Sequence, residues 1–117
     1  MQIPSKVRIG GIDYKVKHIP APTSSDGALC YGTFDPEHSV IELNSEKGLS
    51  HDRMCQTLMH EILHGVMFHY NLTPEDEEVI VTTMARGIFQ VIKDNPKIFQ
   101  EVKNGNLCKR PKGGDLS

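Results

Sequence analysis

The segment from 58 to 66 reads Leu58-Met59-His60-Glu61-Ile62-Leu63-His64-Gly65-Val66, and it constrains the chain more than any other stretch. On a helix, His60 and His64 lie one turn apart on the same side. Two imidazole nitrogens at that spacing can bind one Zn²⁺ ion at about 2.0–2.1 Å. Glu61 points roughly 100° further round the helix, where it can reach a water on the open side of the metal as a general base. The segment therefore predicts His60 and His64 as zinc ligands and Glu61 as a catalytic residue.

This segment belongs to a longer helical pattern that runs from Ser50, a favourable N-cap, to about Tyr70. The apolar residues at three- and four-residue spacing are Cys55, Leu58, Met59, Ile62, Leu63, Val66, Met67 and Tyr70. On a helical wheel the two histidines fall at the margin of this apolar face, and Glu61 falls beyond them. We therefore expect the apolar face in the core and the histidines at the border of a cleft.

A second helix follows a short loop. Its predicted N-cap is Thr73, Pro74 stands at its first position, and Asp94-Asn95-Pro96 ends it. The expected apolar stripe consists of Val81, Met84, Ala85, Ile88, Val91 and Ile92.

A catalytic zinc needs a third protein ligand, and acidic residues cluster at the start of this second helix. Glu77 and Glu78 fall inside or at the border of its apolar arc, whereas Glu75 and Asp76 point away. A carboxylate on the core side of a helix needs a partner, and a metal ion supplies one. Periodicity alone leaves both Glu77 and Glu78 as candidates for the third ligand.

The first third of the chain has the pattern of short strands. Residues 6–9 and 12–17 alternate apolar and polar positions about Gly10 and Gly11, which favours a β-hairpin. Residues 29–34 and 40–43 form a second strand pair, joined by a turn at 35–38. Strands followed by helices predict an α+β domain at 1–103, with a three- or four-stranded, mostly antiparallel sheet and a short last helix at 96–102. We expect residues 104–117 to be a flexible tail.

Composition narrows the classes of partner. The chain has 117 residues and a formal net charge of −2, which gives no electrostatic reason to expect nucleic acid or an anionic membrane. Three dispersed cysteines without a C-x-x-C pair indicate neither a disulfide framework nor a thiolate zinc site. Because no signal peptide or membrane-length apolar run is visible, a cytoplasmic location is expected.

The two helices resemble those of minimal glutamate zincins, including compact phage- or prophage-encoded proteins with an HExxH helix. The residues that carry this resemblance on the second helix are Glu78-Val79-Ile80-Val81-Thr82-Thr83-Met84-Ala85, followed by Gly87-Ile88-Phe89-Gln90-Val91 and Asp94-Asn95-Pro96. The resemblance implies that Glu78 is the third ligand, with Glu77 in reserve. It also implies a zinc-dependent peptidase whose sheet edge, at 29–34 or 40–43, binds an extended peptide or protein substrate.

Other interpretations fit the same residues. A His-Glu-His pattern can arise by chance on an amphipathic helix, or it can hold a structural metal without catalysis. The main alternative function is a non-catalytic, zinc-stapled binding or regulatory protein of phage origin. His18, His38, His51 and His69 lack ligand-like spacing and are expected in surface or cap roles. Cys55 is expected in the core, and Cys108 could reach the metal only from the tail.

Overall fold

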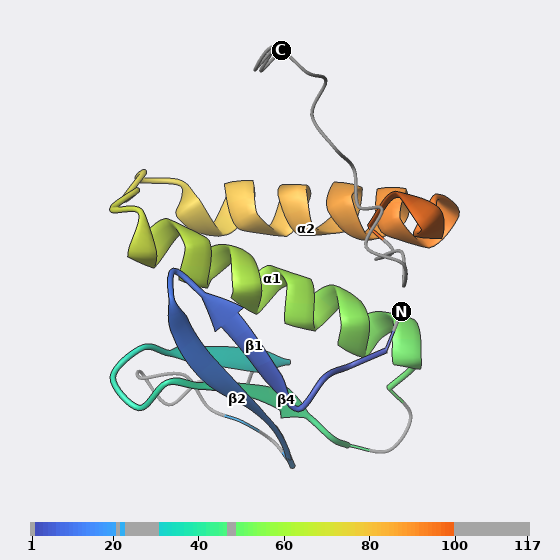
Figure 1. The fold of residues 1–117 in the computed structure, drawn as a ribbon, viewed down its shortest axis with the longest axis horizontal. Coiled ribbons are helices and arrows are strands. Elements are labelled where there is room, and N and C mark those ends of the chain that lie inside the picture. Colours follow the sequence, from blue (N-terminus) through green and yellow to red (C-terminus); the bar gives the residue numbers. More distant parts are fainter. Residues whose placement is uncertain (1, 21, 23–30, 47–48, 100–117) are drawn as a thin grey trace, which may run out of the picture.

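The computed structural model describes residues 2–20, 22, 31–46 and 49–99. Within this part the predicted α+β class is confirmed: a four-stranded sheet precedes two long helices and a 3₁₀ turn. Three layers follow one another in Figure 1: the sheet, then α1 across it, then α2 on the far side of α1. The helix that carries the two histidines is therefore the middle layer.

The sheet is mixed and has the order β1-β2-β4-β3. β1 (Lys6–Ile9) and β2 (Ile12–Ile19) form the predicted hairpin, and β3 (Gly32–Asp35) pairs with β4 (Val40–Asn44) as a second antiparallel hairpin. β2 and β4 are parallel, with Val16 opposite Ile41, and this pairing joins the two hairpins. The prediction of a mostly antiparallel sheet is thus confirmed, since two of the three strand pairings are antiparallel. β3 lies at one edge of the sheet.

Local sequence explains both hairpin turns. Gly10 and Gly11 have φ of 57° and 87°, and two consecutive positive φ angles are what a two-residue type I′ hairpin turn requires. In the second turn, the Asp35 carboxylate accepts a bond from the backbone N–H of His38 at 3.1 Å. The strand predicted at 29–34 begins later, at Gly32, and Leu29 lies outside the described residues.

α1 (His51–His69) begins as predicted, because the Ser50 hydroxyl accepts a bond from the N–H of Arg53 at 3.1 Å. It packs against β1, β3 and β4. Gly65 allows a close approach of α1 to the sheet: a Cβ there would lie 2.9 Å from both Ile9 Cδ1 and Phe34 Cε1. The core between this helix and the sheet consists of Ile9, Tyr14, Val16, Ile41, Leu43 and Leu58.

α2 (Glu77–Asp94) begins later than predicted. Its first backbone bond runs from Ile80 N–H to Asp76 C=O at 3.1 Å, so Asp76 is the N-cap, and Thr73 and Pro74 precede the helix. The prediction of Thr73 as N-cap was therefore wrong. The later start places Glu77 and Glu78 in the first turn, where they face α1.

The apolar stripe of α2 is only partly buried. Val81 and Ala85 are buried, but Met84 is 50% and Val91 39% exposed. Among the described elements, α2 packs against α1 and the 3₁₀ turn η1 (Pro96–Phe99) and touches no strand. A single neighbouring helix cannot cover so wide an apolar arc, so the stripe is divided between core and surface.

The predicted last helix at 96–102 appears as η1, and residues beyond 99, including the tail and Cys108, lie outside the described part. No described helix is long and apolar enough to cross a membrane.

Candidate metal centre

α1 directs two imidazole rings toward one point. His60 and His64 lie one turn apart, their ring centroids are 4.9 Å apart, and their Nε2 atoms are 3.1 Å apart. Both side chains are about one-fifth exposed, at 22% and 21%. The predicted i, i+4 geometry is therefore present on the side of α1 next to the start of α2.

Glu78 completes a triangle of donor atoms. Its Oε1 lies 2.7 Å from His60 Nε2 and 2.9 Å from His64 Nε2. The three ligand atoms come from two helices that meet through an antiparallel turn, and they all lie within 4.8 Å of one another. His60, His64 and Glu78 could therefore hold one metal ion.

The donor set fits a small tetrahedral cation. Ligands at about 2.0–2.1 Å from a tetrahedral zinc are about 3.3 Å apart, and the observed edges of 2.7, 2.9 and 3.1 Å need only a slight expansion. His64 Nδ1 lies 2.7 Å from Glu77 Oε2, which sets Nδ1 as the donor. In the neutral tautomer, His64 Nε2 then presents a lone pair to the Glu78 carboxylate, and a cation between them removes that repulsion.

Glu77 and Glu78 thus hold different positions. Glu78 faces both Nε2 atoms, whereas Glu77 contacts His64 from behind through Nδ1. Glu77 is the less exposed of the two, with 31% of its side chain accessible against 68% for Glu78. A carboxylate bonded to the outer nitrogen of a ligand histidine fixes its ring orientation and raises its basicity. Glu78 is therefore placed to be the third metal ligand, and Glu77 is placed to orient the His64 ring.

The charges in the cluster support one another. Burial disfavours the charged form of His64, but hydrogen bonds to Glu77 and Glu78 outweigh it and raise the His64 pKa. Burial likewise works against ionised Glu78, yet the bonds and charges of His64 and His60 lower the pKa of its carboxyl group. Glu78 therefore stays ionised in this cluster, and a carboxylate must be ionised to bind a metal ion.

Glu61 is more buried than the wheel predicted. It is only 7% exposed, less than either histidine, and it lies on the side of α1 that faces the sheet. On the helical wheel Glu61 falls beyond the histidines relative to the apolar face, yet in the structure it is the most buried of the three. The reason is that α1 is covered on two sides, by the sheet and by α2, so its buried direction differs from its most apolar direction.

Gly32 at the start of β3 makes room for Glu61. A Cβ at Gly32 would lie 2.8 Å from Thr57 Cγ2 and 3.3 Å from Glu61 Cγ. Burial, together with the negative charge of Glu78, raises the pKa of Glu61 to about 7. A carboxylate of that pKa can both accept and release a proton near neutrality. Among the described residues no hydrogen-bond donor holds this carboxylate.

One cleft is lined by all five side chains of the cluster: His60, Glu61, His64, Glu77 and Glu78. Tyr31 and β3 form one wall, and the facing sides of α1 and α2 form the others. Phe68 and Leu72 line one end, and both are more than half exposed. The cleft is therefore bounded by β3, the edge strand of the described sheet, and by the helix pair that carries the donor atoms.

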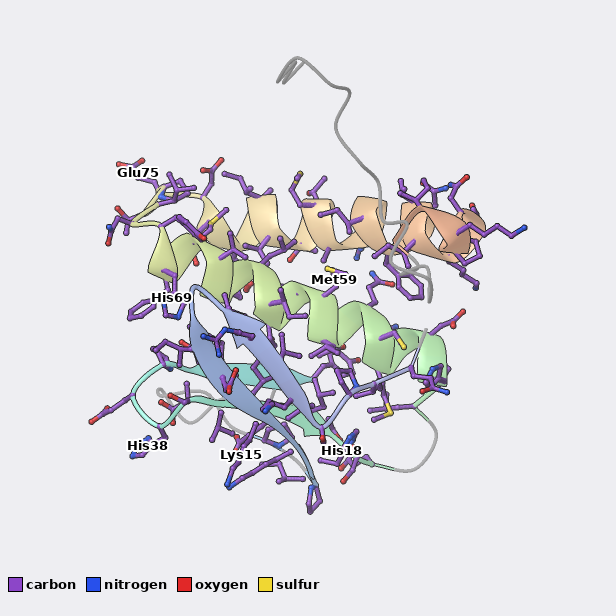
Figure 2. The ribbon with its side chains drawn as sticks, in the orientation of Figure 1. Lys15, His18, His38, Met59, His69 and Glu75 are labelled. Atoms are coloured by element: carbon purple, nitrogen blue, oxygen red, sulfur yellow. The ribbon has the colours of Figure 1, made fainter. Side chains whose placement is uncertain are left out.

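The remaining histidines are elsewhere. Figure 2 shows His18 on β2 and His38 in the turn between β3 and β4, both away from the contact between the helices, and His69 beside the turn of the first hairpin. His69 Nε2 lies 2.6 Å from the buried Tyr14 hydroxyl, a contact that the sequence pattern did not indicate. Cys55 is 1% exposed, which confirms its expected place in the core.

Comparisons with protein-family models, curated proteins and solved structures find no match to this chain. The likeness to minimal glutamate zincins therefore rests on the residues quoted above. The functional argument rests on the geometry of the cleft.

Proposed function

We propose that this chain is a zinc-dependent metallopeptidase of the minimal glutamate zincin type. The observation that carries the proposal is the meeting of His60 Nε2, His64 Nε2 and Glu78 Oε1 in an open cleft, with a buried carboxylate one residue from the first histidine. Three protein donors leave one tetrahedral position for water or substrate, which distinguishes catalytic from structural zinc sites.

Each residue has a defined task in peptide hydrolysis. His60, His64 and Glu78 would hold the zinc ion, and Glu77 would orient the His64 ring. When bound, the metal supplies Lewis-acid chemistry that polarises a carbonyl and acidifies water. Glu61 accepts the proton of the attacking water and passes it to the leaving amine, since its buried carboxyl group exchanges a proton near neutral pH.

The sheet edge offers a means of holding an extended substrate. Among the described strands β3 pairs with β4 alone, and its residues line the cleft. A peptide added to the free edge as a further strand gains backbone hydrogen bonds regardless of its side chains. The scissile bond would then lie between the edge strand and the histidines of α1.

The test begins with metal-free protein. Zinc is titrated into it while bound metal is measured by elemental analysis, and peptide cleavage is followed by mass spectrometry. We expect one zinc per chain and cleavage that depends on it. Glu61→Gln should retain zinc and lose cleavage by several orders of magnitude, because it removes the proton acceptor but none of the three donors.

The matched control is Glu46→Gln, which neutralises an exposed acid remote from the metal cluster and should leave both zinc binding and cleavage unchanged. A Glu61→Gln protein that cleaves peptides as well as the unaltered chain would refute the catalytic assignment. Absence of bound zinc under saturating conditions would refute the metal assignment as well.

A second candidate function is a zinc-stapled binding protein without catalysis. The observation that favours it is that α2 packs only against α1 and η1 among the described elements. A metal ion bound by His60, His64 and Glu78 would therefore add a cross-link between α1 and α2 and stabilise the position of α2. This alternative predicts tight zinc binding, a marked gain in stability and no cleavage of any peptide. Glu61→Gln would then have no functional consequence.

A further inference from the structure

Two arginines on the cleft wall have no part in the chemistry proposed above. Arg53 on α1 and Arg86 on α2 both line the cleft that holds the metal cluster. Neither guanidinium forms an ion pair with a carboxylate of the described residues. By contrast Lys93, on the same helix as Arg86, is bonded to Asp52 across the helix pair. Unpaired guanidinium groups beside a binding cleft are suited to a carboxylate from a ligand.

The two arginines lie toward the same end of the cleft. Arg53 precedes His60 by seven residues, which returns it to the same side of α1 about 10 Å along the axis. Arg86 follows Glu78 by eight residues, about 12 Å along α2. Because the helices are antiparallel, as the Asp52–Lys93 contact shows, both displacements run in the same direction from the metal cluster.

Aromatic contacts align this end with the start of β3. The Arg53 guanidinium lies over the Tyr31 ring, 5.0 Å from its centroid, and Tyr31 immediately precedes β3. Phe34, near the end of the strand, contacts Phe68 fifteen residues further along α1, with centroids 6.0 Å apart. β3 therefore runs along the cleft from the arginine end, past the histidines, toward Asp35.

The direction of a bound peptide follows from this alignment. A strand added to β3 in the more stable antiparallel sense runs from the Asp35 end to the Tyr31 end. Its residues after the scissile bond then approach Arg53 and Arg86. At about 3.3 Å per extended residue, and with the reach of an arginine side chain, the guanidinium groups meet the second or third residue after that bond.

We infer that Arg53 and Arg86 form a carboxylate-binding subsite that selects peptides with an acidic group at the second or third residue after the scissile bond. A side-chain carboxylate and a free C-terminal carboxylate share this chemistry. The inference rests on the proposed peptidase function, and it names the substrate class of the same cleft. The opposite end is lined by Asp35, Glu37, Phe68 and Leu72, with no arginine or lysine among its described residues, and it accepts the residues before the bond.

The test uses the full chain loaded with zinc and two peptides that differ only by Glu or Gln at the second and third residues after the cleaved bond. A third peptide, the Gln version with a free rather than an amidated C-terminus at the third residue, distinguishes the two carboxylate sources. We expect kcat/KM to be about tenfold higher for the Glu peptide, a preference that shrinks at high salt. The double variant Arg53→Ala with Arg86→Ala should bring the ratio to about one, because it removes both cations that distinguish the Glu peptide from the Gln peptide.

Lys15→Ala is the matched control. It removes one positive charge from β2, and Figure 2 shows Lys15 at the sheet, away from both helices. The ratio should stay near its unaltered value in this variant. Cleavage without an acidic preference, or with a preference that the double variant retains, would overturn the inference and leave the proposed function intact. An acidic preference before the cleaved bond would overturn the assigned direction.

If neither peptide is cleaved, the proposed function fails, and binding decides the inference separately. Fluorescence anisotropy then compares the affinity of labelled Glu and Gln peptides for the zinc-loaded chain. A Glu preference that the double variant abolishes supports the subsite, and equal affinities refute it.

Discussion

The tight contact at Gly32 leads to a prediction that links the packing of the sheet to the position of the Glu61 carboxylate. In Gly32→Ala the new Cβ would meet Thr57 Cγ2 at 2.8 Å and the Glu42 backbone oxygen at 2.9 Å. The Glu42 oxygen belongs to β4, which pairs with β3 in the register Thr33 to Glu42, so it cannot move without disturbing the strand pair. α1 and β3 must therefore separate by some tenths of an ångström.

We expect this substitution to destabilise the protein by about 1–3 kcal/mol, the usual cost of overpacking. The loss of backbone freedom in the unfolded chain offsets about 0.4–1 kcal/mol of that cost. The same separation shifts Glu61, whose Cγ lies 3.3 Å from the new Cβ, so peptide cleavage should fall more than zinc affinity. Urea unfolding of metal-free protein, followed by circular dichroism, measures the first effect, and zinc titration with peptide cleavage measures the second.

Gly87→Ala is the matched control, because a Cβ at Gly87 meets nothing within 4 Å and the residue lies inside α2. It should stabilise the protein by about 0.5–1 kcal/mol, since alanine favours a helix interior over glycine. The same Gly→Ala change should thus lower the free energy of unfolding at Gly32 and raise it at Gly87. A Gly32→Ala protein as stable as the unaltered chain would refute the packing argument.

Three further predictions concern the metal and the core. Glu77→Gln should lower zinc affinity about 10- to 100-fold, measured by competition with a chelator, because it weakens the hydrogen bond that orients His64. An unchanged affinity would contradict this orienting role of Glu77. Tyr14→Phe should cost about 1 kcal/mol in urea unfolding because it removes the 2.6 Å contact with His69, whereas Tyr70→Phe at a 65% exposed position should cost almost nothing. Zinc at one hundred times its Kd should stabilise the fold by about 2.7 kcal/mol and slow amide hydrogen exchange throughout α2. Exchange rates in α2 that do not change with zinc would show that the metal does not stabilise this helix.

Features that depend on neighbours in the chain were predictable from the sequence. The Ser50 cap involves a residue three positions away, and the turn at Gly10 and Gly11 depends on their own backbone angles. The two histidines share one side of α1 because helix geometry places residues four apart in line. None of these features requires knowledge of what packs against the element.

The position of Glu61 depended on tertiary structure. A helical wheel locates the most apolar direction of α1, but the sheet and α2 cover this helix from two sides. Glu61 therefore lies under the sheet edge at 7% exposure, in a direction that amphipathicity did not indicate. Helix amphipathicity thus fails to predict the burial of Glu61. That burial has a chemical consequence, because it raises the pKa of the Glu61 carboxyl group to about 7.

The sequence by itself determined that this chain has strands before helices and a His-Glu-His pattern with one side suited to a metal ion. Only the tertiary structure decided which acid meets the Nε2 atoms and which lies behind His64, because that choice depends on where α2 begins and how it crosses α1. It also brought Arg53 and Arg86 to one cleft from positions far apart in the sequence. Periodicity describes one helix at a time, whereas a binding site is made where two helices and a sheet edge meet.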